Sequence, residues 1–315
     1  MNPQGKPPLL PSAVLTSGTS KPHITVCICT FKRAVMLNRL LDALNNQTTG
    51  GLFCYSVVVA DNDRARSAES VVTRFLLTSH VAVRYCVEPR QNIALVRNAA
   101  LQCAESELIA FIDDDEFPDD NWLYALFQVI VNRAVDGVLG PVKPYFEAEP
   151  PQWVRKGGFF VRPSHPTGYL MTWPEARTGN VLFRRGILDA NEIPFRPQFD
   201  TAGEDLDFFR RMMEKGCEFV WCEEATVYEV VPQSRCKRRY LLRRALLRGS
   251  NFTKHPAHRL KNITKSLLAV PCYTMILPVV LVFGEHLFLR YLIKLLDHTS
   301  RLFAFLGWRI IRERA

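Results

Sequence analysis

The stretch FIDDDEFPDDNWL, residues 111–123, decides the fold class of this chain and points to its chemistry. The apolar run 108–112 leads directly into four acids. This pattern predicts a buried β-strand that delivers carboxylates to the edge of a sheet. Because side chains alternate along a strand, we expect Asp113 and Asp115 to face one way and Asp114 the other. Two carboxylates on one side are hard oxygen ligands that suit Mg²⁺ or Mn²⁺, and such a site favours transfer from a diphosphate-bearing donor.

Acids at this place also have a second explanation, because carboxylates often cap helices. We assign a capping role to Asp119 and Asp120 at the start of a helix predicted over 121–133. Capping does not explain three further acids directly after a buried strand, where unpaired carboxylates repel each other. The run 113–116 taken alone therefore leaves a metal site and a structural role both open.

The bulk composition is that of a folded chain of one large domain with an appendage, or of two domains. The chain has 315 residues, of which 48% are hydrophobic and 23% charged. Its nine Cys are odd in number and show no C-x-x-C spacing, which favours a reducing cytosolic compartment over a disulfide framework or a zinc site. Residues 1–22, rich in Pro, Ser, Gly and Thr, are predicted to be a flexible N-terminal tail without the apolar core of a signal peptide.

The first half of the chain alternates between predicted strands and helices. Continuous apolar strands separated by helices predict an α/β fold, a Rossmann-like, mostly parallel sheet with helices on both faces. Right-handed crossovers place the loops after the strands along one edge, where ligands bind in such sheets. The expected strands are 24–29, 55–60, 82–87 and 108–112, and the expected helices are 34–46, 67–79, 93–105 and 121–133.

Three polar loops are expected to converge at that edge. They are 30–33 (TFKR), 61–63 (DND) and 113–116 (DDDE). No G-x-G-x-x-G follows the first strand, and no G-x-x-x-x-G-K-[ST] occurs, so a dinucleotide oxidoreductase and a P-loop enzyme are disfavoured.

The second half supplies a long loop-like segment, a strand and an acidic helix start. Residues 141–178 are dense in Pro, Gly and aromatics, and Trp153 and Trp173 suit either the face of a sugar or the core. A short strand is expected over 178–184. A helix is expected over 203–216, with Gly-Glu-Asp at its start.

These motifs, in this order, resemble glycosyltransferase family 2. The turn 30–33 resembles the T-[YF]-x-R turn of that family, and 113–115 resembles its D-x-D. Asp61 falls where the family keeps an Asp for the base of the donor. The resemblance runs from about residue 23 to 230 and is most similar to bacterial exopolysaccharide glucosyltransferases of the succinoglycan type. The other matching segments are Asn92 with Arg97-Asn98, Thr178-Gly179-Asn180 and Gly203-Glu204-Asp205.

The resemblance implies a GT-A fold, a nucleotide-sugar donor, a divalent metal (Mg²⁺ or Mn²⁺) and inversion at the anomeric carbon. Asp205 would be the catalytic base with Glu204 beside it, and Asp115 and Asp113 would hold the metal. Donor-binding residues would be Thr30, Phe31, Arg33, Asp61, Asn92, Arg97, Asp113 and Asp114, and acceptor-binding residues would be Trp153, Trp173, Gly179 and Asn180.

Two positions depart from the pattern of the family. The frequent Pro before the Thr is Cys29, and the frequent D-D-G-S is 60–63, ADND. The second departure concerns the uridine contacts and leaves the metal and base positions untouched.

The C-terminal part is basic and then apolar. Residues 235–265 hold eleven Lys and Arg and no acid, and residues 266–284 are uncharged. An amphipathic segment follows, with Arg290 and Lys294 on its polar stripe. This order favours an anionic membrane surface over a nucleic-acid partner. Packing of these helices on the catalytic domain is the alternative, and a single pass across the membrane by 266–284 stays open because Pro271 and Pro278 interrupt it.

Together these observations predict three parts. A tail (1–22) precedes a glycosyltransferase domain (23–232), with a nucleotide-sugar half (23–140) and an acceptor half (141–232). A membrane-associated helical tail (233–315) follows. We expect an inverting transferase that moves a hexose, from a UDP-sugar, to a glycan on a polyprenyl diphosphate at the cytoplasmic face of the membrane. The alternatives are a catalytically silent sugar- or nucleotide-binding protein of the same fold, and a nucleic-acid binder.

Overall fold

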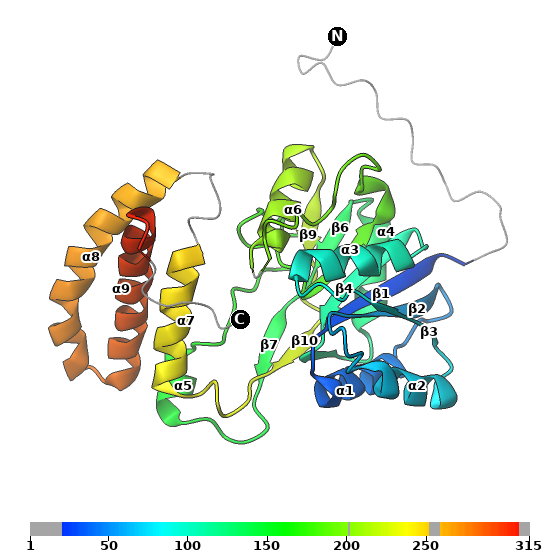
Figure 1. The fold of residues 1–315 in the computed structure, drawn as a ribbon, viewed down its shortest axis with the longest axis horizontal. Coiled ribbons are helices and arrows are strands. Elements are labelled where there is room, and N and C mark those ends of the chain that lie inside the picture. The colour runs from blue at the N-terminus through cyan, green and yellow to red at the C-terminus, as the bar shows by residue number, and fades with distance from the viewer. Residues whose placement is uncertain (1–20, 201, 252–258, 309–315) are drawn as a thin grey trace, which may run out of the picture.

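A seven-stranded sheet forms the centre of the catalytic domain in the computed structural model, which describes residues 21–200, 202–251 and 259–308 (Figure 1). The predicted tail 1–22 lies outside the described residues except for its last two. The strand order is β3-β2-β1-β4-β8-β6-β9, and only β8 runs antiparallel to its neighbours. The strands are β1 (His23–Thr30), β2 (Cys54–Asp61), β3 (Ala82–Val87), β4 (Leu108–Asp113), β6 (Gly137–Leu139), β8 (Asn180–Arg184) and β9 (Phe219–Trp221).

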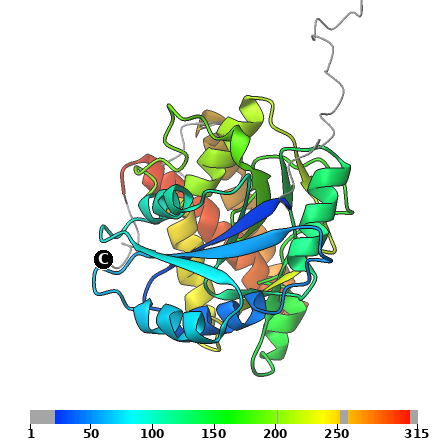
Figure 2. The same cartoon turned by 90° about the vertical axis from the view of Figure 1, so that its right-hand side faces the viewer.

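Helices cover both faces of this sheet, as the continuous apolar strands predict. One buried cluster joins the sheet to α1 (Ala34–Leu44), α2 (Glu69–Thr78) and α4 (Trp122–Asn132). A second cluster on the other face includes residues of α3 (Ile93–Cys103) and α6 (Glu204–Glu214). A view at right angles shows β1, β2 and β3 side by side between α3 and the pair α1 and α2 (Figure 2).

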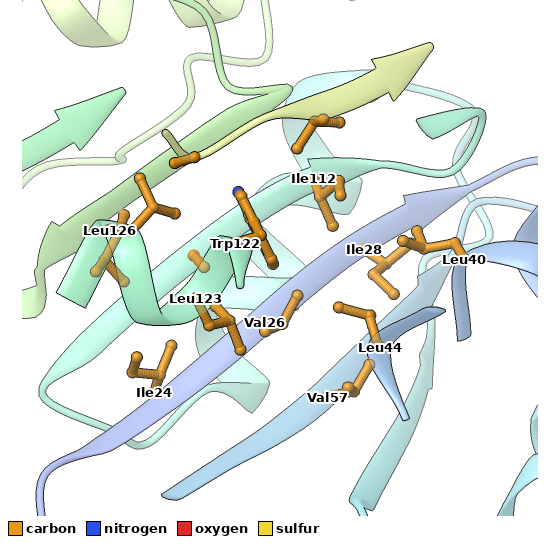
Figure 3. Close-up of a cluster of buried hydrophobic side chains, with 14 of the residues drawn as sticks. Ile24, Val26, Ile28, Leu40, Leu44, Val57, Ile112, Trp122, Leu123 and Leu126 are labelled. Carbon is orange, nitrogen blue, oxygen red and sulfur yellow. The ribbon is translucent and has the colours of Figure 1, made fainter. Parts of the chain in front are cut away.

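Apolar side chains of β1 and β4 fill the space under α1 and α4. In Figure 3, Ile28 of β1 lies near Leu40 and Leu44 of α1, while Val26 lies near Leu123 of α4. All of these side chains are fully buried. The four strands and four helices predicted in the first half are confirmed with ends that differ by up to two residues.

A second, three-stranded sheet, in the order β5-β10-β7, was not predicted. Its strands are β5 (Glu116–Pro118), β7 (Val142–Tyr145) and β10 (Val227–Val230). These strands are too short to show the alternation of polar and apolar side chains that is typical of a strand. β5 begins at the last acid of the run 113–116, close to the place where helix capping was expected. The helix α4 has Asn121 at its N-cap without a side-chain cap, so the capping role assigned to Asp119 and Asp120 is wrong. The segment 141–178, which was expected to be loop-like, also contains α5 (Gln152–Gly157). The short 3₁₀ helix η1 (Arg185–Ile187) follows β8.

Three helices follow the catalytic domain and stand beside it (Figure 1). They are α7 (Arg238–Asn251), α8 (Arg259–Val282) and α9 (Glu285–Phe305). α9 packs against both α7 and α8, and also against α5. Within the tail, Arg238 of α7 pairs with Glu285 of α9. Arg290 of α9 donates to the carbonyl of Gly157 over 2.8 Å, so the helical tail is tied to the domain at its α5 side.

Candidate active site

A cleft of about 810 Å³ opens where β1 and β4 end. The tertiary structure brings distant parts of the chain to it, among them the turn after β1, the acids after β4, and the segment that leads into and begins α7. Its walls include Thr30, Phe31, Arg33, Asn62, Asn92, Arg97, Asp113, Asp114, Asp115, Arg162, Asp200, Glu229, Arg235, Tyr240 and Arg244.

All three aspartates of the D-D-D run line this cleft, which corrects the expected alternation. The strand β4 ends at Asp113, so Asp114 and Asp115 lie in a turn where alternation no longer applies. Asp114 accepts hydrogen bonds from the Thr30 hydroxyl and from Arg33, both at 2.7 Å. The first turn and the acid run are therefore locked together across the ends of β1 and β4.

Asp115 is held by two guanidinium groups. Arg33 lies 3.2 Å and Arg235 3.0 Å from its Oδ2 atom. Arg235 also pairs with Glu229 at 2.9 Å, so one guanidinium joins carboxylates from the turn after β4 and from β10. Asp115, which is predicted to be a metal ligand, thus has two cationic partners.

Several carboxylates lie close together in the acid cluster, which is formed by residues 113–116. Burial raises the pKa of Asp113, and the charges of Asp115 and Asp205 add to this effect while Arg97 opposes it. Burial also raises the pKa of Asp114 to about 6, against the opposing influence of Arg33 and Thr30. The pKa of Glu116 lies well above its ordinary value because of burial and the charge of Asp113. A cation in this cluster would relieve the repulsion.

The oxygens of this cluster fit a divalent cation that is bound together with phosphate. Mg²⁺ is usually held by one or two carboxylates plus phosphate oxygens and water. Within the described residues no group of three or more His, Cys, Asp or Glu is placed to hold a metal by itself. The backbone of Gly179 lies so close that a Cβ there would stand 3.1 Å from Asp113 Oδ2 and 2.9 Å from Glu116 Oε1. Glycine at this position therefore leaves the carboxylates uncrowded, and Asp113 and Asp115 are the residues that would hold the cation.

The other side of the site is the start of α6. Gly203 has a φ of +97° at the N-cap, a conformation that glycine adopts without strain. Glu204 is buried and pairs with Arg97, which also lies 3.4 Å from Asp113. Arg97 thus connects the acid run to α6.

The side chain of Asp205 is less deeply buried than that of Glu204. Its Oδ1 accepts from the backbone N–H of Leu206 at 2.7 Å, while Arg177 lies 3.9 Å from Oδ2. Its side chain is only partly exposed, and its charge raises the pKa of Asp113. Asp205 therefore lies near the acid run with one carboxylate oxygen outside any close hydrogen bond among the described residues.

Two of the predicted donor-binding residues, Asp61 and Asn92, bind backbone groups of their own loop or helix start. Asp61 is fully buried, does not line the cleft, and accepts from Tyr85, Asp63 and Ala68 at 2.8–2.9 Å. Asn62, its neighbour, lines the cleft instead. Asn92 lines the cleft but also caps α3 through its Oδ1.

The four predicted acceptor residues have different surroundings. Trp153 packs in a small cluster with Val154 and Phe160, and Trp173 packs against the core. Asn180 is buried and its amide is fully engaged: Trp122 donates to it at 2.8 Å, and it donates to the carbonyls of Pro141 and Ala225. Of the four residues, only Gly179 lies against the acid cluster.

Several residues of the site were not singled out from the sequence. Arg162 and Glu229, which pair with each other, lie in a loop and in a short strand without a chemical motif. Arg235, Tyr240 and Arg244 lie in the basic segment assigned to the membrane, so their contribution to the cleft was missed. The spacing of four residues between Tyr240 and Arg244, one helical turn, was the one signal available.

A mostly parallel sheet, an acid run at its carboxyl edge and a Gly-Glu-Asp helix start facing that run define a glycosyltransferase of the GT-A fold. A similar fold occurs in the mannosyltransferase PcManGT from Pyrobaculum calidifontis, solved with GDP-Man and Mn²⁺ (TM-score 0.61, 18% identity, 92% of this chain and 87% of that chain). It also occurs in S. aureus TarS 1-349 in complex with UDP (TM-score 0.53, 17% identity, 93% of this chain and 94% of that chain). At these identities the likeness concerns the fold, which confirms the predicted fold class.

Sequence comparison gives the family. The model of "Glycosyl transferase family 2" matches residues 25–190, and that of "Glycosyl transferase family group 2" matches 108–310. The succinoglycan biosynthesis protein ExoM of Rhizobium meliloti (strain 1021) is 31% identical over 256 residues, 78% of this chain and 80% of that protein. The chain belongs to glycosyltransferase family 2, as its motifs predicted.

Proposed function

We propose that this glycosyltransferase moves a hexose from a UDP-sugar to a glycan carried by a polyprenyl diphosphate, with inversion, in bacterial exopolysaccharide synthesis. The observation that carries the proposal is the connection made by Arg97 between Asp113 of the acid run and Glu204, the neighbour of Asp205. This connection supports a role of Asp113 in the donor diphosphate site and of Asp205, next to Glu204, as the base. The relationship to a succinoglycan biosynthesis protein supports the pathway, and structures solved with UDP and UDP-GlcNAc support the donor class.

The leaving group is the first requirement of this reaction. As the glycosidic bond to the donor breaks, negative charge develops on the diphosphate, and a group that stabilises this charge accelerates the step. Asp113 and Asp115 would hold a divalent cation, which supplies that stabilisation when bound. Arg33, 3.2 Å from Asp115, adds a positive charge of the protein itself at the same place.

The acceptor hydroxyl is the second requirement. It must lose its proton as it attacks the anomeric carbon from the face opposite the leaving group. Asp205 takes this role because its side chain is partly exposed, whereas Glu204 is buried and pairs with Arg97. A single displacement with one base inverts the anomeric centre.

The helical tail supports attachment to a membrane surface. Within the described residues, one helix, Ile263–Val282, is long and apolar enough to cross a membrane by length and composition, and only 6% of it is buried. Its exposed residues include Leu268 at 72% and Met275 at 79%. Because α9 packs along α8 and the basic α7 lies beside them, we propose a peripheral or monotopic position at the cytoplasmic face of the plasma membrane.

The test is a donor screen with the purified full chain. UDP- and GDP-hexoses are offered with Mn²⁺ or Mg²⁺, and donor hydrolysis and transfer to a lipid extract are measured. Turnover of a UDP-hexose supports the proposal. Binding of donors without any hydrolysis or transfer would instead support the catalytically silent alternative.

A further inference from the structure

The start of the helical tail forms one wall of the donor cleft. Arg235 precedes α7, and Tyr240 and Arg244 lie one helical turn apart on it, so the last two share a face. All three line the cleft together with Asp113 and Asp115. The segment that the sequence assigned to the membrane therefore also belongs to the site.

Arg235 bridges two carboxylates. A bound cation and an anion together could take over these contacts. Its guanidinium pairs with Asp115 at 3.0 Å and with Glu229 at 2.9 Å. Guanidinium groups favour bidentate binding of carboxylates and phosphates alike. When a cation takes the charge of Asp115, the guanidinium of Arg235 becomes available to phosphate oxygens.

Among the described residues, Arg244 has no such partner. Three other arginines of the cleft are paired with acids: Arg33 with Asp114 and Asp115, Arg97 with Asp113 and Glu204, and Arg162 with Glu229. In the part of the chain that the structure describes, Arg244 is exposed and no carboxylate lies within ion-pair distance of it. An exposed arginine beside a phenol in a cleft of paired charges suits an anionic ligand.

The geometry points to a diphosphate-binding wall built by Arg235, Tyr240 and Arg244, which makes the helical tail part of the active site. This inference rests on the proposed function. The diphosphate comes from one of two sources, the nucleotide donor beside Asp115 or the polyprenyl diphosphate of the acceptor. Both present the same chemistry to the two guanidinium groups.

The test compares matched variants of the full chain by titration calorimetry in the presence of Mn²⁺. Arg235→Gln and Arg244→Gln remove one charge each from the wall. Arg239→Gln is the control, since Arg239 is an exposed residue of the same helix that does not line the cleft. UDP and UMP probe the donor source, and farnesyl diphosphate probes the lipid source. Thermal unfolding of each variant verifies the fold. Arg244→Gln, which breaks no ion pair among the described residues, keeps the test valid if Arg235→Gln does not fold.

We expect both wall variants to bind a diphosphate about tenfold more weakly than Arg239→Gln does, a change of about 1.4 kcal/mol. A loss for UDP that exceeds the loss for UMP identifies the donor as the source, and a loss only for farnesyl diphosphate identifies the lipid. Equal affinities of Arg244→Gln and Arg239→Gln for both diphosphates overturn the inference. If the unmodified protein binds UDP while the variants do not differ, only this inference fails. If it binds neither UDP, GDP nor farnesyl diphosphate, the proposed function fails with it.

Discussion

The guanidinium of Arg235 lies 3.0 Å from the carboxylate of Asp115, although 120 residues separate them in the sequence. This contact joins the helical tail to the acid run of the catalytic domain. The domain boundary predicted at 232/233 therefore divides the cleft, and truncation after Val231 would remove Arg235, Tyr240 and Arg244 from its wall. Membrane attachment and chemistry are better separated by substitutions on α8 than by truncation.

Asp115→Ala is expected to lower the rate of transfer by on the order of 100-fold or more, because the leaving diphosphate loses the carboxylate that would hold its counter-charge. The measurement is release of the nucleoside diphosphate from the donor. Asp120→Ala, which removes an exposed acid of the same segment, should keep its activity. Excess EDTA should reproduce the loss in the unmodified chain, and full activity in EDTA would show that no metal is needed.

Asp205→Asn is expected to keep donor binding and to lose turnover by on the order of 100-fold or more, since only proton transfer from the acceptor is removed. Donor affinity is measured by calorimetry and turnover by product formation. Glu204→Gln is the comparison: it weakens the contact with Arg97 and thereby also the position of Asp113, so it should raise the donor Kd. Normal turnover of Asp205→Asn, with loss in Glu204→Gln alone, assigns the base to Glu204.

Asn180→Ala is expected to destabilise the fold by on the order of 3 kcal/mol, because the N–H of Trp122 and two buried carbonyls would lose their partner. Urea unfolding followed by circular dichroism measures this loss. Asn191→Ala, at an exposed position, should change stability by less than about 0.5 kcal/mol. A stable Asn180→Ala variant with a selective defect in acceptor use would restore the acceptor-binding role that the sequence suggested.

Leu268→Glu and Met275→Glu, on the exposed face of α8, are expected to reduce sedimentation of the full chain with vesicles that contain phosphatidylglycerol. Charges on that face oppose burial in the lipid. High salt should release the unmodified protein only partly, because it screens the basic residues and not the apolar contact. Leu77→Glu is the matched control, since Leu77 is 82% exposed on α2 of the catalytic domain. If the unmodified chain stays in the supernatant at low salt, α8 does not bind the membrane.

The stability of the helical tail is expected to fall as the pH drops below about 6.5, the ordinary pKa of histidine. His298 is buried between α8 and α9 and shares a hydrogen bond with Ser266 over 2.9 Å. Burial and the charge of Arg301 lower its pKa, so the folded state keeps it neutral while the unfolded state takes up a proton. The stability is thus fully present above the unfolded pKa and is lost as the pH falls towards the folded pKa.

Thermal unfolding at pH 7.5 and 5.5 measures this dependence. The charge of Asp297 opposes the lowering of the His298 pKa, while the charges of Lys265 and Lys294 add to it. His298→Asn, which cannot take up the proton, should reduce the loss between the two pH values. An equal loss in both proteins would assign the pH dependence to other groups.

The sequence by itself determined the α/β class, the family and the acid run. The pattern of apolar residues set the first four strands and helices. Residues 108–112 are an example: apolar residues favour burial, and the acids after them favour the edge of the sheet. The Gly before Glu204 and Asp205 fixed the start of α6, because its positive φ of +97° suits glycine. These features depend on neighbours in the chain, so local chemistry was enough to predict them.

Only the tertiary structure decided which side chains share the cleft. Asp61 falls in a family motif, yet its carboxylate already accepts hydrogen bonds from Tyr85 and two backbone N–H groups. Arg235 falls in a basic run, yet it bridges Asp115 and Glu229. The second sheet, β5-β10-β7, brings Glu229 opposite Glu116 through pairing of strands that lie far apart in the chain. Such contacts depend on non-local pairing and on competition between charged partners, and no local pattern of residues encodes either.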